Sequence, residues 1–261
     1  MGDVLGLHLL QGLDMVATPR RSALARLDRE GRLTALDLAG PDEEILALVR
    51  GDEAVALVVD APLAVPDDRG RRDVEAVLAW CDITAFPVSR RRLDTVHGGA
   101  RGVALAPALD RPGRALRETV PDAVLRQIAW ERVHPPGAAA LELADYRAAW
   151  LAVRAPAFRA KGTGRARPQG IVAAWRLLGE VLDLGGWAPG PSSDDWAAIN
   201  DAARIDALCC AYAALRSRSA GAHVLIGAPG HGCVTLPADA NLAGRVALTL
   251  ERLRGEGAIR F

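Results

Sequence analysis

Three acidic side chains occupy positions from which a carboxylate could do chemistry: Asp60, Glu118 and Asp206. Asp60 ends an apolar run, Glu118 lies near the end of a strand expected at residues 114–120, and Asp206 lies beside the apolar stripe of a long helix. Carboxylates brought together from separate segments bind hard divalent cations such as Mg²⁺ or Mn²⁺. A pair of such ions can activate water and stabilise the leaving oxygen of a phosphodiester. Because the chain has 32 acidic residues, this triplet alone is a weak signal.

The apolar run before Asp60 predicts a central strand. Residues 55–59 are mostly β-branched and show no polar alternation, which is typical of a strand covered by helices on both faces. In open α/β sheets, ligands and catalytic groups gather just beyond the carboxyl ends of such strands. Pro62 and Pro66 then end the strand and stiffen the loop that follows. Asp60 could instead make a turn or cap a helix, and periodicity does not separate the two interpretations.

Basic residues offer candidate phosphate ligands. Arg90, Arg91 and Arg92 form a triplet that suits phosphate groups near the acids, although arginine triplets are also common on plain solvated faces. Lys161 is the only lysine among 32 basic residues, and its compact ammonium could contact a phosphate as a point charge. The glycine-containing segment around it is not a P-loop, because the lysine precedes the glycines.

Composition sets the broad class. The 261 residues are 50% hydrophobic and 25% charged, with a formal net charge of zero, so nothing indicates a general polyanion binder. We find no apolar run long enough to span a membrane and no signal peptide, and we expect a cytoplasmic protein. The four cysteines include no pair with metal-binding spacing, which favours core packing.

Periodicity and turn residues predict a single compact α/β domain. A segment at residues 84–111 has little periodicity and is interpreted as an ordered functional loop. The expected strands are residues 4–9, 23–28, 33–38, 55–59, 114–120, 223–228 and 233–236. The expected helices are residues 41–51, the second half of 67–82, 122–133, 138–153, 169–184, a long helix that begins near residue 192, and 238–253.

The order of these elements carries a resemblance to a known family. Six segments contribute to it: VVDAPLAVP, GRRDVE, TAFPVS, RETVPDAVL, KGTGRA and DAARIDALCCAYAA. Together they span most of the chain, although none is a short diagnostic motif. In these segments and their order the chain resembles the domain of unknown function 429 family of predicted ribonuclease H-like nucleases. The resemblance implies a ribonuclease H-like mixed sheet flanked by helices, in one domain over residues 1–261 with insertions at about 67–113 and 138–190.

The same resemblance implies roles for individual residues. Asp60, Glu118 and Asp206 match the catalytic, metal-binding acids of such a fold, with Mg²⁺ or Mn²⁺ as the cofactor. The first strand departs from the pattern, because His8 stands where a GxD phrase would place the leading aspartate. A neutral imidazole can bind Mn²⁺ but suits Mg²⁺ poorly, so His8 is a fourth candidate ligand of a weaker metal site.

The expected function is metal-dependent cleavage of phosphodiester bonds in a nucleic acid or nucleotide, with Lys161 and the arginine triplet receiving phosphate. The alternative is a catalytically inactive ribonuclease H-like protein with a binding or regulatory role, motivated by His8 and by the zero net charge. A third interpretation, a kinase-like member of the wider actin and ribonuclease H group, would need a phosphate-binding glycine turn after the first strand. That stretch contains only Gly12. The oligomeric state stays open.

Overall fold

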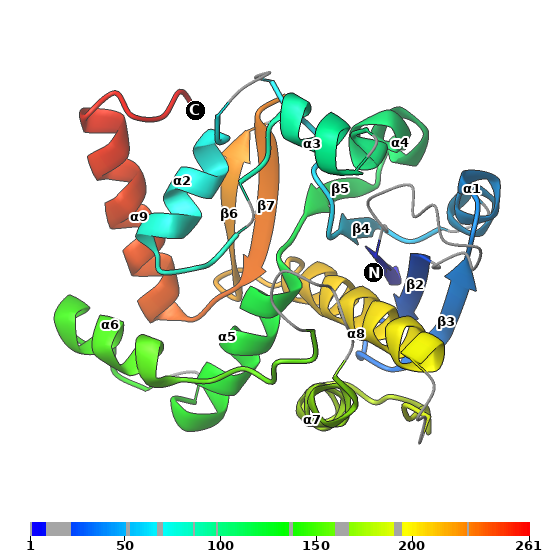
Figure 1. Ribbon diagram of the computed structural model, residues 1–261. Coiled ribbons are helices and arrows are strands. Elements are labelled where there is room, and N and C mark those ends of the chain that lie inside the picture. The colour runs from blue at the N-terminus through cyan, green and yellow to red at the C-terminus, as the bar shows by residue number, and fades with distance from the viewer. Residues whose placement is uncertain are drawn as a thin grey trace.

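The computed structural model describes residues 2–8, 22–50, 53–66, 70–85, 87–97, 99–135, 138–159, 167–190, 195–228 and 230–261, and the account below concerns these residues. Its seven strands form one mixed sheet with helices on both faces (Figure 1). The strands are β1 Val4–His8, β2 Ser22–Leu27, β3 Leu33–Ala39, β4 Ala56–Val59, β5 Ala115–Glu118, β6 His223–Ala228 and β7 Gly232–Pro237. The helices are α1 Asp42–Arg50, α2 Asp73–Trp80, α3 Arg90–His97, α4 Arg101–Leu109, α5 Pro121–Val133, α6 Leu143–Ala152, α7 Pro168–Leu178, α8 Asp195–Arg216 and α9 Ala240–Gly255.

The strands lie in the order β3-β2-β1-β4-β5-β7-β6. β1, β2 and β3 are joined by antiparallel pairing, whereas β4 is parallel to β1, β5 to β4 and β7 to β5. The carboxyl ends of β1, β4, β5 and β7 therefore meet at one edge of the sheet. In the register of the three central strands, Leu7 pairs with Val59, and Val59 pairs with Glu118.

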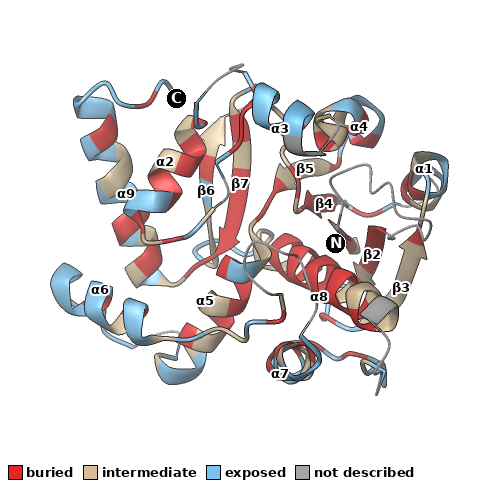
Figure 2. Cartoon of the chain, viewed as in Figure 1, coloured by how far each residue is buried: buried red, intermediate tan, exposed pale blue. Residues whose placement is uncertain are grey.

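One face of the sheet packs against α5 and α8, and α7 packs on these two helices. Val4, Ala56 and Val58 point to this face and join a core cluster with Ala207 and Ala211 of α8. Figure 2 shows α8 as buried along most of its visible length. Its alanine-rich sequence explains this placement, because small side chains allow a helix backbone to lie close to the strands.

Gly6 marks the closest approach of α8 to the sheet. A Cβ at this position would lie well inside van der Waals contact with the carbonyl oxygen of Ala207 and the backbone nitrogen of Ala211. A side chain larger than hydrogen at residue 6 is therefore incompatible with the observed position of α8.

The opposite face is covered by two groups of helices. Leu5, Leu7, Leu57 and Val59 point to this face and pack with apolar side chains of α1 and α4. Helices α2 and α9 cover the end of the sheet formed by β6 and β7, at the left of Figure 1. Successive side chains of β1 and β4 thus pack into the hydrophobic clusters on opposite faces of the sheet, because side chains alternate between the two faces of a strand.

All seven expected strands are confirmed, with bounds that differ by a few residues where they are described. The ordered loop expected at residues 84–111 is wrong in part, because it contains α3 and α4. Helix α3 contains few apolar residues, and of these Leu93 packs with Val65 and Val88. Helix α4 contains Pro107. The expected helix 138–153 begins only at Leu143, and the expected helix 169–184 ends at Leu178.

The cysteines pack as expected. Cys81, Cys209 and Cys210 are buried free thiols, and Cys233 is half-buried. Burial raises the pKa of Cys209 and Cys210 well above the ordinary value, so both thiols stay protonated at neutral pH. Within the described helices, none combines the length and apolar character that crossing a membrane requires.

Candidate functional site

A cavity of about 470 Å³ lies at the carboxyl ends of β4 and β5. Two of the three acids expected to form a site, Asp60 and Glu118, line it, together with Asp122 at the start of α5. The cavity wall also contains Arg72 and Glu75. The backbone positions these groups because parallel strands end at the same edge of the sheet, and each is followed by a turn into a loop or helix.

The Glu118 carboxylate is bound by other groups of the protein. Its side chain is buried and lies 2.9 Å from the Arg72 guanidinium, and its Oε1 accepts a 2.9 Å hydrogen bond from the backbone N–H of Leu63. Burial raises the pKa of Glu118, against the opposing effect of the Arg72 charge and of backbone N–H donors. Glu118 thus ties the loop after β4 to β5 and to the start of α2.

Arg72 also binds a second buried carboxylate. Its Nε donates a 2.7 Å hydrogen bond to Glu75, and its Nη1 donates to the carbonyl oxygen of Ala64 at 2.9 Å. Burial tends to lower the pKa of Arg72, but the charges of Glu118 and Glu75 outweigh it and the pKa is raised. The guanidinium therefore stays charged and forms ion pairs with carboxylates on both sides.

The strand register directs Glu118 and Asp60 to different faces of the sheet. Glu118 pairs with Val59, and the alternation of side chains along a strand places both of them on the face that packs against α1 and α4. Asp60 follows Val59 by one residue, so alternation directs it to the face covered by α8. Asp206 belongs to α8 and lies on that second face. Asp60 and Glu118 thus reach the wall of the same cavity from alternate faces, and Asp206 is not part of its described wall.

Asp206 is paired with a different arginine, Arg159. Arg159 donates hydrogen bonds through Nε, at 3.1 Å, and through Nη2 to Oδ2 of Asp206. Burial tends to lower the pKa of Arg159, but the charge of Asp206, followed by those of Asp60 and Asp122, outweighs it and the pKa is raised. The same three acids contribute, after burial, to the raised pKa of Cys209 on α8. Asp206 is thus the acid in contact with Arg159, and the charges of Asp60 and Asp122 act on the same guanidinium.

Sequence reasoning missed Asp122, Arg159 and Arg72 as members of the site. Asp122 follows Pro121 in the first turn of α5, a position that also suits a carboxylate for ordinary helix electrostatics. Arg159 belongs to a basic segment that the sequence shows, but nothing in its spacing identifies Asp206, 47 residues away, as its partner.

The arrangement does not fit a divalent cation as it stands. Carboxylate oxygens are suitable ligands for Mg²⁺ or Mn²⁺, yet arginines hold both Glu118 and Asp206. Across the described part of the chain, no group of three or more acidic, histidine or cysteine side chains could hold a metal ion. The metal site expected from Asp60, Glu118, Asp206 and His8 stays a prediction.

The other expected site residues are only partly described. His8 ends β1 at the same edge of the sheet, but its side chain lies outside the described residues, as does all of Lys161. Arg90, Arg91 and Arg92 form the exposed first turn of α3, and they are not part of the described cavity wall. Their role as phosphate ligands stays a prediction.

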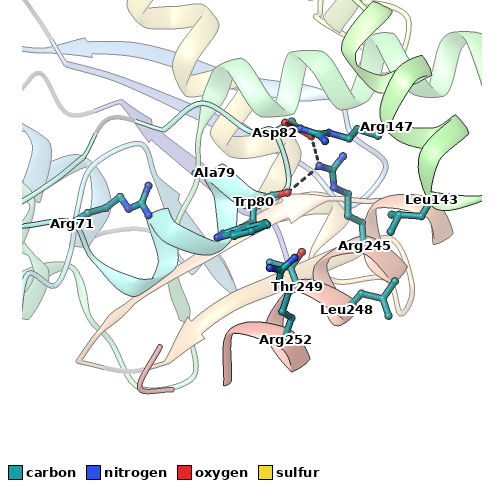
Figure 3. Close-up of a pocket in the computed structure, with 10 residues that line it drawn as sticks. All are labelled: Arg71, Ala79, Trp80, Asp82, Leu143, Arg147, Arg245, Leu248, Thr249 and Arg252. Carbon is teal, nitrogen blue, oxygen red and sulfur yellow. Dashed lines mark hydrogen bonds and ion pairs between the residues drawn. The ribbon is translucent and has the colours of Figure 1, made fainter. Parts of the chain in front are cut away.

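A second cavity, of about 390 Å³, lies between α2, α6 and α9 (Figure 3). Asp82, at φ 54°, accepts hydrogen bonds from Arg147, at 2.9 Å, and from the buried Arg245. Arg252 stacks over the exposed indole of Trp80 at 4.3 Å. The Asp82 carboxylate thus forms ion pairs with two arginines and joins α2, α6 and α9.

The Asp82 cluster predicts a pH-dependent contribution to stability. Burial tends to raise the pKa of Asp82, but hydrogen bonds and charges from Arg147 and Arg245 outweigh it, and the pKa is lowered. The contribution is therefore present above pH ~4, the ordinary range of the group, and is lost as pH falls through the folded-state pKa. We expect Asp82→Asn, which tolerates a positive φ, to lower the free energy of unfolding by about 1–2 kcal/mol at pH 7.

Urea denaturation of both proteins at pH 7 and near pH 3 measures this difference. It should shrink at the lower pH, because protonation of the Asp82 carboxyl then favours the unfolded wild-type chain, in which its pKa is higher. A difference that is the same at both pH values would contradict the assigned cause.

The chain matches no family model, and no curated protein shows significant similarity to it.

Proposed function

We propose that this protein is a ribonuclease H-like hydrolase that cleaves phosphodiester bonds of a nucleic acid or nucleotide, with Mg²⁺ or Mn²⁺, at the carboxylates near the carboxyl end of β4. The observation that carries the proposal is the topology of the first five strands. They lie in the order β3-β2-β1-β4-β5, with an antiparallel hairpin followed by strands parallel to β1. An acid follows β4, and α8, which packs on β1 and β4, carries another.

The cavity and its charges support this function. Asp60 and Asp122 line an open volume large enough for a nucleotide fragment, and Asp206 lies near them in the electrostatic environment of Arg159. A divalent ion bound to such acids would supply charge neutralisation for a phosphodiester. The chain's own contribution is to bring acids from a strand end and two helices to one edge of the sheet.

The test is cleavage of single-stranded and double-stranded DNA, RNA and a DNA–RNA hybrid, with Mn²⁺ or Mg²⁺. We expect metal-dependent cleavage by the wild-type protein and a loss on the order of 100-fold or more for Asp60→Asn, which keeps the side-chain shape but removes the charge. Glu251→Gln, which changes an exposed carboxylate on α9, is the matched control and should leave the rate unchanged. Equal rates for Asp60→Asn and the wild type would contradict the assignment.

A second candidate is a non-catalytic protein that binds the same ligands. The observation that favours it is the neutralisation of Glu118 by Arg72 and of Asp206 by Arg159. The same nucleic acids decide between the two candidates. Saturable binding, measured by fluorescence anisotropy, without cleavage in Mn²⁺ would support the second candidate.

A further inference from the structure

We propose that the cavity between α2, α6 and α9 binds an organic phosphate of mononucleotide size, with arginines of its wall contacting the phosphate and Trp80 contacting the base. The proposal goes beyond the hydrolase function and does not rest on it, since none of the described lining residues of this cavity lines the cavity at β4 and β5. Its volume of about 390 Å³ falls within the range of about 300–1,000 Å³ typical of small-molecule sites.

The wall of this cavity carries an excess of positive charge. Its described lining residues include four arginines against a single acid, Asp82, which is a formal excess of three positive charges. Figure 3 shows these side chains arranged around Trp80. The chain as a whole has a formal net charge of zero, so the excess is local. A concave wall with one dominant sign of charge concentrates ligands of the opposite sign. The four arginines are Arg71, Arg147, Arg245 and Arg252.

The acid of the wall is shared by several arginines. Asp82 accepts hydrogen bonds from Nε of Arg147, at 2.9 Å, and from Nη2 of Arg245. A third arginine, Arg126, donates at 3.3 Å to the backbone carbonyl oxygen of Asp82. One carboxylate cannot balance the charges of all the guanidinium groups gathered around it, so a second anion is favoured here.

Arg245 provides an unused donor at this cavity. Its side chain is only 6% exposed. Its Nη2 donates to the carbonyl oxygen of Trp80, at 2.9 Å, and to Asp82, whereas Nη1 is buried and has no hydrogen-bond partner in the described part of the chain. A buried donor without a partner costs free energy. A phosphate oxygen bound in the cavity that Arg245 lines would supply this partner.

Trp80 provides an aromatic surface at the same cavity. The residue is 46% exposed even though the guanidinium of Arg252 lies 4.3 Å from the centroid of its ring. Arg252 also pairs with Glu256, but both side chains are about half exposed, and such pairs are weak. Nucleobases stack on aromatic side chains. The combination of cations with an exposed indole therefore favours a phosphate that carries a planar ring over an inorganic ion.

The experiment is calorimetric titration with three probes: AMP, ribose 5-phosphate, which lacks the base, and adenosine, which lacks the phosphate. EDTA is present throughout, so that no divalent ion can bind at the proposed catalytic carboxylates. We expect the wild-type protein to bind AMP at one site, and to bind each of the other two probes about tenfold or more weakly. Absence of AMP binding, or equal affinities for AMP and either fragment, would overturn the proposal.

Variants of the wall assign each part of the ligand. Trp80→Leu should weaken AMP binding about tenfold but leave the affinity for ribose 5-phosphate unchanged, because only AMP carries the base. Arg147→Gln and Arg252→Gln should each weaken the binding of both phosphates about fivefold or more. Arg254→Gln, which changes an exposed arginine of α9 outside the described wall, is the matched control and should bind as the wild type does.

The variants also decide where AMP binds. Arg147 contacts Asp82 and its loss can affect folding, whereas Arg252 lies in an exposed ion pair, so Arg252→Gln keeps the test available if Arg147→Gln is unstable. An AMP affinity that is unchanged in both Trp80→Leu and Arg252→Gln would overturn the proposal. Asp60→Asn should bind AMP as the wild type does, and loss of binding in this variant would place the nucleotide in the cavity at β4 and contradict the proposal.

Failure of this proposal differs from failure of the proposed function. AMP binding that is lost in Trp80→Leu, without cleavage of any nucleic acid by the wild type, would support this site and contradict the hydrolase. Metal-dependent cleavage by the wild type without AMP binding in EDTA would support the hydrolase and overturn this site.

Discussion

Replacing Gly6 with alanine is expected to destabilise the protein by about 3 kcal/mol or more, because the new methyl group would overlap the backbone of α8 at Ala207 and Ala211. Overlap with a flexible side chain can be relieved by a change of rotamer, but both atoms here belong to a helix backbone. Helix α8 would have to move away from β1, and its buried apolar contacts would loosen along its length. Urea denaturation monitored by circular dichroism measures the loss.

Gly244→Ala is the matched control for this substitution. Gly244 is exposed within α9, and a Cβ built there meets no atom within 4 Å. The same chemical change should stabilise the protein by about 0.5–1 kcal/mol through helix propensity. A stability loss of less than about 1 kcal/mol for Gly6→Ala would show that α8 can move at low cost, and would contradict the close packing described above.

Replacing Arg72 with methionine is expected to cost about 3–5 kcal/mol, because it leaves two buried carboxylates without their shared cation. Glu75 and Glu118 are each 3% exposed, and Arg72 lies between them with hydrogen bonds to both. Glu75 also accepts a 2.9 Å hydrogen bond from the backbone N–H of Val88. The substitution therefore also loosens the loops that form the wall of the cavity.

The control for Arg72→Met is Arg132→Met on α5. Arg132 forms an exposed ion pair with Glu180 at 3.3 Å, and such pairs contribute about 0–1 kcal/mol. In a double variant, Glu118→Gln should recover part of the stability lost in Arg72→Met, since it removes one of the unpaired charges. A cost for Arg72→Met no larger than that for Arg132→Met would contradict a buried charge network at this site.

Local sequence patterns determined most of the secondary structure. The apolar run of β4, the two hairpins and the acidic first turn of α1 are each specified by neighbouring residues, and the structure has the strands and helices that they predict. Two short helices, α3 and α4, were not predicted, because α3 has few apolar residues and α4 carries Pro107 within a mostly apolar sequence. The sequence also placed Asp60 and Glu118 near the ends of two strands, and the structure pairs these strands in parallel.

The composition of the site was decided by tertiary structure. A single residue of strand register separates Glu118, which pairs with Val59, from Asp60, which follows it, so alternation directs the two acids to opposite faces. No local pattern specifies which residues of two strands pair. Likewise, Arg159 meets Asp206 only because the segment before α7 packs against α8. The sequence by itself thus determined which elements carry acids, and packing between distant elements determined which of those acids meet, and which arginines neutralise them.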